Sequence, residues 1–159
     1  MNTMKREHLA MLASYQVSDL RSAGYSASDL LRAGCSASDL RNAGYSFDEK
    51  IPDLKNPYSV LLADIDEKKR VHNQSTFGPV NDPATNLCKT QMCTAGHLVN
   101  MAGEEGYALK EKYGWALAAA LIHDASHPGW PCQNFNSIPQ EWAMAYIEEM
   151  AAREQAEAK

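Results

Sequence analysis

The chain lacks the features that mark membrane, secreted and nucleic-acid-binding proteins. No apolar run in the 159 residues approaches the length that crosses a bilayer, and the N-terminus holds no apolar signal-peptide core. Basic residues are outnumbered, giving a net charge of −5, and the single basic cluster at 68–70 follows acidic residues in the same segment. We therefore expect a cytoplasmic protein whose default partner is neither a membrane nor nucleic acid.

Cysteine is also scarce, with four residues in the whole chain. In a reducing cytoplasm, thiols stay free or bind metal and seldom form disulfides. Covalent staples are not needed either, because a chain of this length buries enough apolar surface to fold without them.

A ten-residue repeat is the clearest pattern that is present. The copies, which begin at residue 15, read YQVSDLRSAG, YSASDLLRAG and CSASDLRNAG, and a partial copy, YSFDEKI, follows. In the second copy, Ser26 and Asp29 match a capping box, and Tyr25 with Leu30 matches a hydrophobic staple. Gly34 falls where a helix ends in a left-handed residue. The repeat therefore predicts one helix of about two turns per copy.

Helices this short are not stable alone, so the copies are expected to stack. Stacking would bury a continuous seam and leave the arginines Arg21, Arg32 and Arg41 in water. The predicted seam consists of Tyr15, Leu20, Tyr25, Leu30, Leu40 and Tyr45. Two roles stay open for this array, namely a helical appendage that packs on the main domain and a docking surface for another protein.

The middle of the chain predicts a helix followed by a long loop. Asn56 and Pro57 are suited to the N-cap and first helical position, and residues 72–86 are rich in Asn, Pro, Ser and Thr. The inward face of this helix is expected to contain Val60, Leu61, Leu62 and Ile65.

The remainder predicts further helices. The apolar run WALAAALIH reads as a buried helix that ends before Pro128. Ser137 and Gln140 match a capping box for a last helix, whose apolar face includes Trp142 and whose tail after Ala151 is expected to fray. We therefore predict an all-α protein, with a short decapeptide-repeat array followed by a small domain of three to four helices. The predicted segments are 1–51, 52–86 and 87–159.

The segment LCKTQMCTAGHLVNMAG holds the main candidate site. If Cys93 or Thr94 opens a helix, Cys93 and His97 lie one turn apart on the same side, although away from the stripe that most obviously faces the core. His123 and His127 repeat that spacing. Thiolates and imidazoles in fourfold geometry favour zinc. The candidate ligands are Cys88, Cys93, His97 and His123, with His127 and Cys132 as further possibilities.

Two other interpretations compete with the zinc site. The spacing is not that of a standard zinc finger or ribbon, and a reduced cysteine often serves as a small buried hydrophobe. Alternatively, Cys93 at a helix N-terminus is the nucleophile of a cysteine-dependent enzyme, with Gln91 at the oxyanion and His97, His123 or His127 as the base. No feature of the sequence fixes the geometry that this chemistry requires.

The same residues carry a family resemblance. Cys88, Thr90, Cys93 and the run Ala95-Gly96-His97 match a C-x-T-x-x-C-x-A-G-[HW] motif. This motif resembles that of a family of small uncharacterised bacterial and phage-encoded proteins, and the likeness extends over about half of the chain, from Thr76 to Glu149. The resemblance implies a phage-related or mobile-element protein but no activity. Because relatives have Trp at the position of His97, it does not imply an obligatory metal ligand there.

Taken together, these patterns favour a non-enzymatic protein-binding or accessory protein that acts through contacts with another protein. The repeat array, the acidic charge and the lack of a fixed catalytic constellation carry this expectation. The alternative is a zinc-binding regulator or a cysteine-dependent enzyme that uses Cys93 with His97 or His123.

Overall fold

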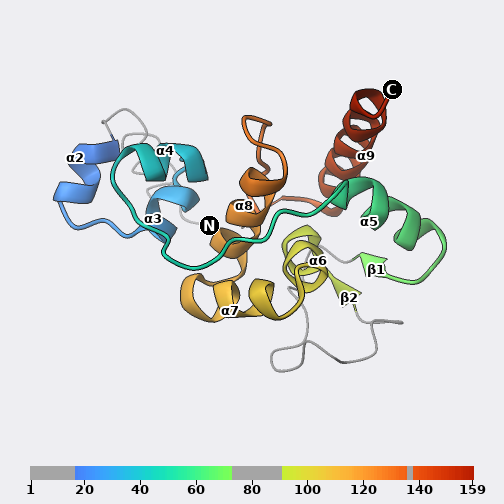
Figure 1. Ribbon diagram of the computed structural model, residues 1–159, viewed down its shortest axis with the longest axis horizontal. Coiled ribbons are helices and arrows are strands. Elements are labelled where there is room, and N and C mark those ends of the chain that lie inside the picture. The colour runs from blue at the N-terminus through green and yellow to red at the C-terminus, as the bar shows by residue number, and fades with distance from the viewer. Residues whose placement is uncertain (1–16, 73–90, 136–137) are drawn as a thin grey trace. The chain divides into compact units, whose positions relative to one another are not determined.

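The computed structural model describes residues 17–72, 91–135 and 138–159, and these residues form an all-α protein (Figure 1). The chain divides into two compact units, Met1–Glu49 and Lys50–Lys159. Tyr15 of the predicted seam, Cys88 of the predicted zinc site and Ser137 of the predicted capping box lie outside the described ranges. So do Thr76 and Thr90 of the family resemblance and residues 73–86 of the predicted loop. No helix within the described ranges is long and apolar enough to cross a membrane.

The first unit contains one short helix for each described copy of the repeat. These helices are α2 (Val17–Ser22), α3 (Ala27–Arg32) and α4 (Ala37–Asn42). The predicted capping box is confirmed in α3, where Asp29 N–H donates to Ser26 Oγ at 3.1 Å, and it recurs in α4. Gly34, with φ of +102°, ends α3 in the left-handed region where only glycine is unstrained. Each helix is therefore defined within its own ten residues.

The buried seam between these helices contains fewer residues than the repeat predicts. Leu20, Leu30 and Leu40 are buried, whereas Tyr25 and Tyr45 are only half-buried. Tyr45 donates its hydroxyl to the Tyr25 backbone carbonyl, so the hydroxyl edge of the Tyr45 ring stays near a polar group. Arg21 is exposed as expected, but its guanidinium also lies 5.6 Å from the centre of the Tyr45 ring.

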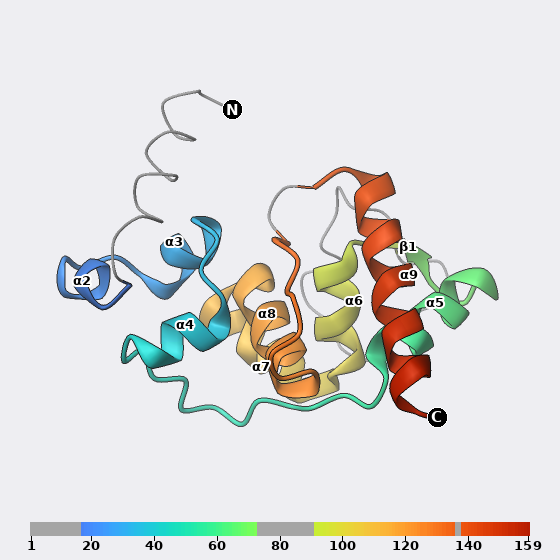
Figure 2. The ribbon, with the colours of Figure 1, turned by 90° about the horizontal axis from the view of Figure 1, so that it is seen from above.

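The second unit contains the remaining helices and one small strand pair. Its helices are α5 (Pro57–Asp66), α6 (Thr94–Met101), α7 (Gly103–Tyr113), α8 (Trp115–Ser126) and α9 (Gln140–Glu157). Strands β1 (Val71–His72) and β2 (Gln91–Met92) pair in parallel, with Val71 opposite Gln91. Helices α6, α7 and α8 pack on one another, while α5 lies along α9 (Figure 2).

Two glycines shape the region around α6 and α7. Gly103, with φ of +62°, is the first residue of α7 and lies just after the end of α6. Gly106 lies within α7, where a Cβ atom would come within 2.2 Å of the Val99 carbonyl oxygen. The absence of a side chain at Gly106 therefore allows the backbones of α6 and α7 to approach closely.

Three expectations about helix faces and ends are wrong. Trp142 is 66% exposed and Val60 is 44% exposed, so neither belongs to the buried face of its helix. Helix α9 does not fray after Ala151 but continues to Glu157, because Ala151 and Glu154 are buried against α5. These errors share one cause. Helical periodicity shows which residues lie on the same face of a helix, but it does not show how much of that face the neighbouring helices cover.

Candidate functional site

A buried carboxylate on α9 holds the beginning of α5. Glu154 Oε1 accepts from the Tyr58 backbone N–H at 3.0 Å, and Oε2 accepts from the Ser59 N–H at 2.6 Å. These N–H groups have no partner inside the helix, and the positive end of the helix dipole favours a negative charge there. Asn56, the predicted N-cap, has left-handed φ of 48° and makes no side-chain cap. Glu154, remote in sequence, performs that role instead.

The same carboxylate reaches the end of α8. Glu154 Oε1 lies 2.7 Å from His127 Nε2, and both side chains are buried. Trp130 stacks on the His127 ring, with centroids 4.1 Å apart. One glutamate on α9 thus makes three hydrogen bonds, to the beginning of α5 and to the end of α8, which help to offset the lost hydration of its buried carboxylate.

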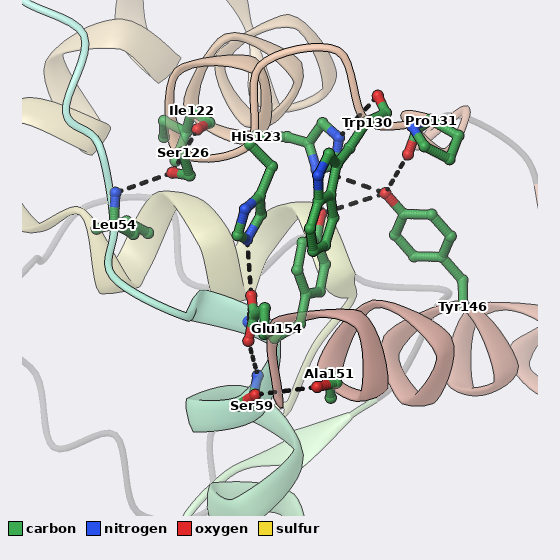
Figure 3. A network of polar contacts seen from close by, with 12 residues as sticks. Leu54, Ser59, Ile122, His123, Ser126, Trp130, Pro131, Tyr146, Ala151 and Glu154 are labelled. Atoms are coloured by element: carbon green, nitrogen blue, oxygen red, sulfur yellow. Dashed lines mark hydrogen bonds and ion pairs between the residues drawn. The ribbon is translucent and has the colours of Figure 1, made fainter. Parts of the chain in front are cut away.

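A second set of hydrogen bonds, around Tyr58 and His123, lies beside the Glu154 contacts. Tyr58 Oη and His123 Nδ1 are 2.6 Å apart, while His123 Nε2 is 3.5 Å from the Trp130 carbonyl. Because that carbonyl can only accept, Nε2 carries the proton and Nδ1 accepts from Tyr58. Tyr146 donates to the Pro131 carbonyl at 3.0 Å and lies 3.3 Å from Tyr58 Oη (Figure 3). Each of these side chains therefore has a protein partner.

Burial shifts the pKa values of Tyr58 and His123. Burial, followed by the nearby Tyr146, raises the pKa of Tyr58 well above its ordinary value. Burial lowers the pKa of His123, and the neighbouring His127 adds to that effect. Burial therefore favours the neutral forms of Tyr58 and His123, which hydrogen-bond to each other.

A different environment surrounds His97, near the beginning of α6. The His97 side chain is 0% exposed, and neither ring nitrogen has a hydrogen-bond partner in the described parts of the chain. Burial, with the nearby Arg70 and His72, lowers the pKa of His97 to about 3. The backbone at Val71 and Met92 opposes this shift without forming a hydrogen bond of normal geometry. The sequence placed His97 away from the core, and that expectation is wrong.

His72 stacks over His97 and is only half-buried. The two ring centroids are 5.8 Å apart at an angle of 24°. His72 Nε2 lies 3.1 Å from Thr94 Oγ1, and its Nδ1 lies 2.8 Å from the Gln140 side-chain amide. Burial lowers the pKa of His72. His72 thus links β1 to the first residue of α6 and the first residue of α9.

The described thiols are not activated for nucleophilic chemistry. Cys93 is the N-cap of α6, as the sequence suggests, and its Sγ accepts from the Gly96 N–H at 3.5 Å. Burial nevertheless raises the pKa of Cys93, although the backbone of Gly96 and Ala95 opposes the shift. Burial also raises the pKa of Cys132 to about 12. Because the thiolate is the nucleophile, these environments disfavour the cysteine-enzyme interpretation.

The predicted ligands fall into two clusters. Cys93 and His97 lie at the beginning of α6, but His123 belongs to the network with Tyr58, and Cys88 lies outside the described residues. Within the described ranges, no three His, Cys, Asp or Glu side chains are grouped to hold a metal ion. Sequence reasoning missed Tyr58, Glu154 and His72, because their partners are remote in sequence and no local spacing marks them.

Comparisons with known proteins add no family to this description. No protein-family model matches the chain, and neither the search of curated proteins nor the search of solved structures returned a significant match.

Proposed function

We propose that this is a non-enzymatic binding or accessory protein, and that its repeat unit is the surface that contacts another protein. The observation that carries the proposal is the repeated exposure of the same positions on successive helices. Asp19, Asp29 and Asp39 are all exposed, while the leucine that follows each of them is buried.

The capped helices would present these groups in a fixed arrangement. In α3 and α4, the Ser26–Asp29 and Ser36–Asp39 boxes hold each aspartate through backbone and side-chain hydrogen bonds. Groups that are ordered before binding lose less conformational entropy when a partner docks. Evenly spaced polar groups on stacked repeats are also the usual binding surface of repeat proteins.

The second unit supplies a complementary reason to favour binding over catalysis. Its largest polar cluster, around Glu154 and His123, is buried and internally satisfied, and the thiols of Cys93 and Cys132 have raised pKa values. A network of this kind stabilises a fold and presents no reacting group to a substrate.

Site-specific crosslinking in the full-length protein tests the proposal. A photo-reactive residue is placed at Ser18 or Asn42 in the repeat unit and, as a matched control, at Ala152 on the exposed side of α9. The expected result is one crosslinked protein from the repeat positions and none from Ala152. With the photo-reactive residue at Ser18, the double variant R32E/N42R should reduce that crosslink by about tenfold or more, since unfavourable charges at an interface cost several kcal/mol.

A matched charge change in the second unit completes the design. The variant E148R alters an exposed residue of α9 and should leave the crosslink intact. The proposal is overturned if no crosslinked partner forms from the repeat positions, or if E148R abolishes the crosslink while R32E/N42R does not.

A further inference from the structure

We propose that the stacked rings of His72 and His97 form an acid-operated switch, in which proton uptake by both rings releases β1 from the first turn of α6 and opens that turn. The two ring centroids are 5.8 Å apart, and the ring planes are inclined by 24°. His72 belongs to β1 and His97 to α6, so the stack joins the two elements. Two positive charges this close repel each other, and a buried position strengthens the repulsion. Protonation of both rings therefore opposes the closed arrangement.

The His97 ring is poorly placed to carry a positive charge. Its side chain is fully buried, and neither ring nitrogen has a hydrogen-bond partner in the described parts of the chain. A charge on this ring would lose its hydration without compensation. Burial, followed by Arg70 and His72, lowers the pKa of His97 to about 3 from its ordinary value of 6.5. Once the first turn of α6 opens, the ring meets water and regains its ordinary pKa, so the open form binds a proton that the closed form does not.

The neutral ring of His72 links β1 to both α6 and α9. Nδ1 lies 2.8 Å from the side-chain nitrogen of Gln140, and Nε2 lies 3.1 Å from the hydroxyl oxygen of Thr94, the first residue of α6. The same Gln140 nitrogen donates to the His72 carbonyl at 3.4 Å, so Nδ1 accepts from it and Nε2 carries the proton. A proton added at Nδ1 would set two donors against each other and break the link to α9. Because the His72 ring is only half-buried, acid reaches it before His97.

A permanent charge beside the stack also opposes protonation. Arg70, which immediately precedes β1, is buried, and its guanidinium stays positive throughout the acid range. This guanidinium already has partners, namely Asp64 on α5, 3.0 Å from Nε, and Asn100 on α6, 3.1 Å from Nη1. The Asp64 carboxylate is thus paired with Arg70, and a proton on His97 would add a second positive charge near that arginine.

The other titratable groups around α6 do not offset this repulsion. A phenol on α7, an imidazole on α8 and the thiol at the N-cap of α6 each have a hydrogen-bond partner, and these groups belong to Tyr107, His123 and Cys93. Within the described ranges, no carboxylate is among the groups that shift the pKa of His72 or His97. Burial therefore dominates for both rings, and it favours their neutral forms.

Two proton-binding rings make the switch steep. Opening returns both rings to pKa values near 6.5, so the stability of the closed form is complete above pH 6.5 and declines as pH falls. Between pH 7 and 5, one histidine can raise the opening equilibrium constant by at most about 25-fold, and a second histidine multiplies that figure. A response larger than about 25-fold therefore requires both rings.

Hydrogen exchange of single amides in the full-length protein tests the switch. The reporter is the His97 N–H, which donates to the Cys93 carbonyl at 2.9 Å, and the reference is the amide of Leu121 in the buried part of α8. We expect the protection factor of the His97 amide to fall by more than about 25-fold between pH 7 and 5. It should stay below that of Leu121 and should not respond to low concentrations of denaturant, because a local opening exposes little surface.

Two variants alter the switch in the closed form. H72Q removes one titrating ring and should limit the fall to about 25-fold or less. Q140E puts a carboxylate beside His72 Nδ1, so the closed form also binds a proton there, and the fall should again be about 25-fold or less. The matched control A145E adds the same charge at another exposed position of α9 and should behave as the natural protein does.

Four results would overturn the proposal. They are a fall of about 25-fold or less in the natural protein, an undiminished fall in H72Q, equal falls in Q140E and A145E, and matching protection factors and denaturant responses of the His97 and Leu121 amides. The last result would mean that acid acts by global unfolding. If H72Q does not fold, Q140E decides the question, because Gln140 is exposed.

Discussion

The two units of this protein differ in where the capping residues of their helices lie in the sequence. In the repeat unit, α3 is capped by Ser26 and Asp29, which are three residues apart. In the second unit, α5 is capped by Glu154, whose separation from Tyr58 along the chain is 96 residues. Local capping uses residues that are neighbours in the sequence, whereas the Glu154 cap exists only after α5, α8 and α9 have assembled. The comparison predicts small, local effects of mutation in the first unit and large, cooperative effects in the second.

Removal of the Glu154 carboxylate should have the largest effect. E154A leaves the N–H groups of Tyr58 and Ser59 and the His127 ring unpaired in a buried position. We expect the free energy of unfolding of the second unit to fall by about 3–5 kcal/mol. Denaturant titration followed by tryptophan fluorescence measures this unit alone, because Trp115, Trp130 and Trp142 all lie within it.

The neighbouring exposed residue provides the control for Glu154. Q155A should change the stability by less than about 0.5 kcal/mol, as surface substitutions generally do. A loss below about 1 kcal/mol in E154A would mean that the Glu154 network is not what holds α5.

Adding a side chain at Gly106, where the backbones of α6 and α7 approach closely, should have the next largest effect. In G106A, the new Cβ lies 2.2 Å from the Val99 carbonyl oxygen, which is backbone and has little freedom to move. We expect a loss of about 3 kcal/mol, although alanine is the better helix former. The control A108G, on the exposed side of the same helix, should cost only about 1 kcal/mol. Equal losses in the two variants would show that helix propensity outweighs packing here.

Acid should destabilise the second unit through His97. The pKa of His97 in the folded protein is about 3, below its ordinary value of 6.5, so the unfolded state takes up protons first as pH falls. This contribution to stability is complete above pH 6.5 and declines as pH falls toward 3. Between pH 7 and 4.5 we expect a loss of about 2–3 kcal/mol.

The variant H97L isolates this part of the pH dependence. Denaturant titrations at pH 7 and 4.5 should show a smaller difference for H97L than for the natural protein. Some dependence should persist, because the pKa values of His72 and His123 are also lowered by burial. An unchanged difference in H97L would exclude His97 as its source.

The smallest effect is expected in the repeat unit. S36A removes the N-cap of α4, to which the Asp39 N–H donates at 3.0 Å, and should reduce local stability by about 1 kcal/mol. Hydrogen exchange of α4 amides measures it. The control S38A changes an exposed serine inside the same helix and should not raise the exchange rates. Matching increases in both variants would show that the cap is not the stabilising group.

Much of the local structure follows from the sequence. The repeat predicts the positions of the short helices, α8 ends before Pro128, and Cys93 is the N-cap of α6 as expected. These signals act within a few residues, so the chain carries them whatever its tertiary structure. The all-α class follows from the same signals, whereas the resemblance to phage-encoded proteins stays a prediction.

Only the tertiary structure decided which residues meet. In the folded protein, His97 is buried and Trp142 is exposed. Glu154 caps the beginning of α5, and the predicted zinc ligands lie in two clusters. No local rule predicts these pairings, because each depends on how wide a face the neighbouring helices cover and on which buried polar groups need a partner. The sequence by itself therefore determined the helices and their caps, and packing determined the polar contacts between them.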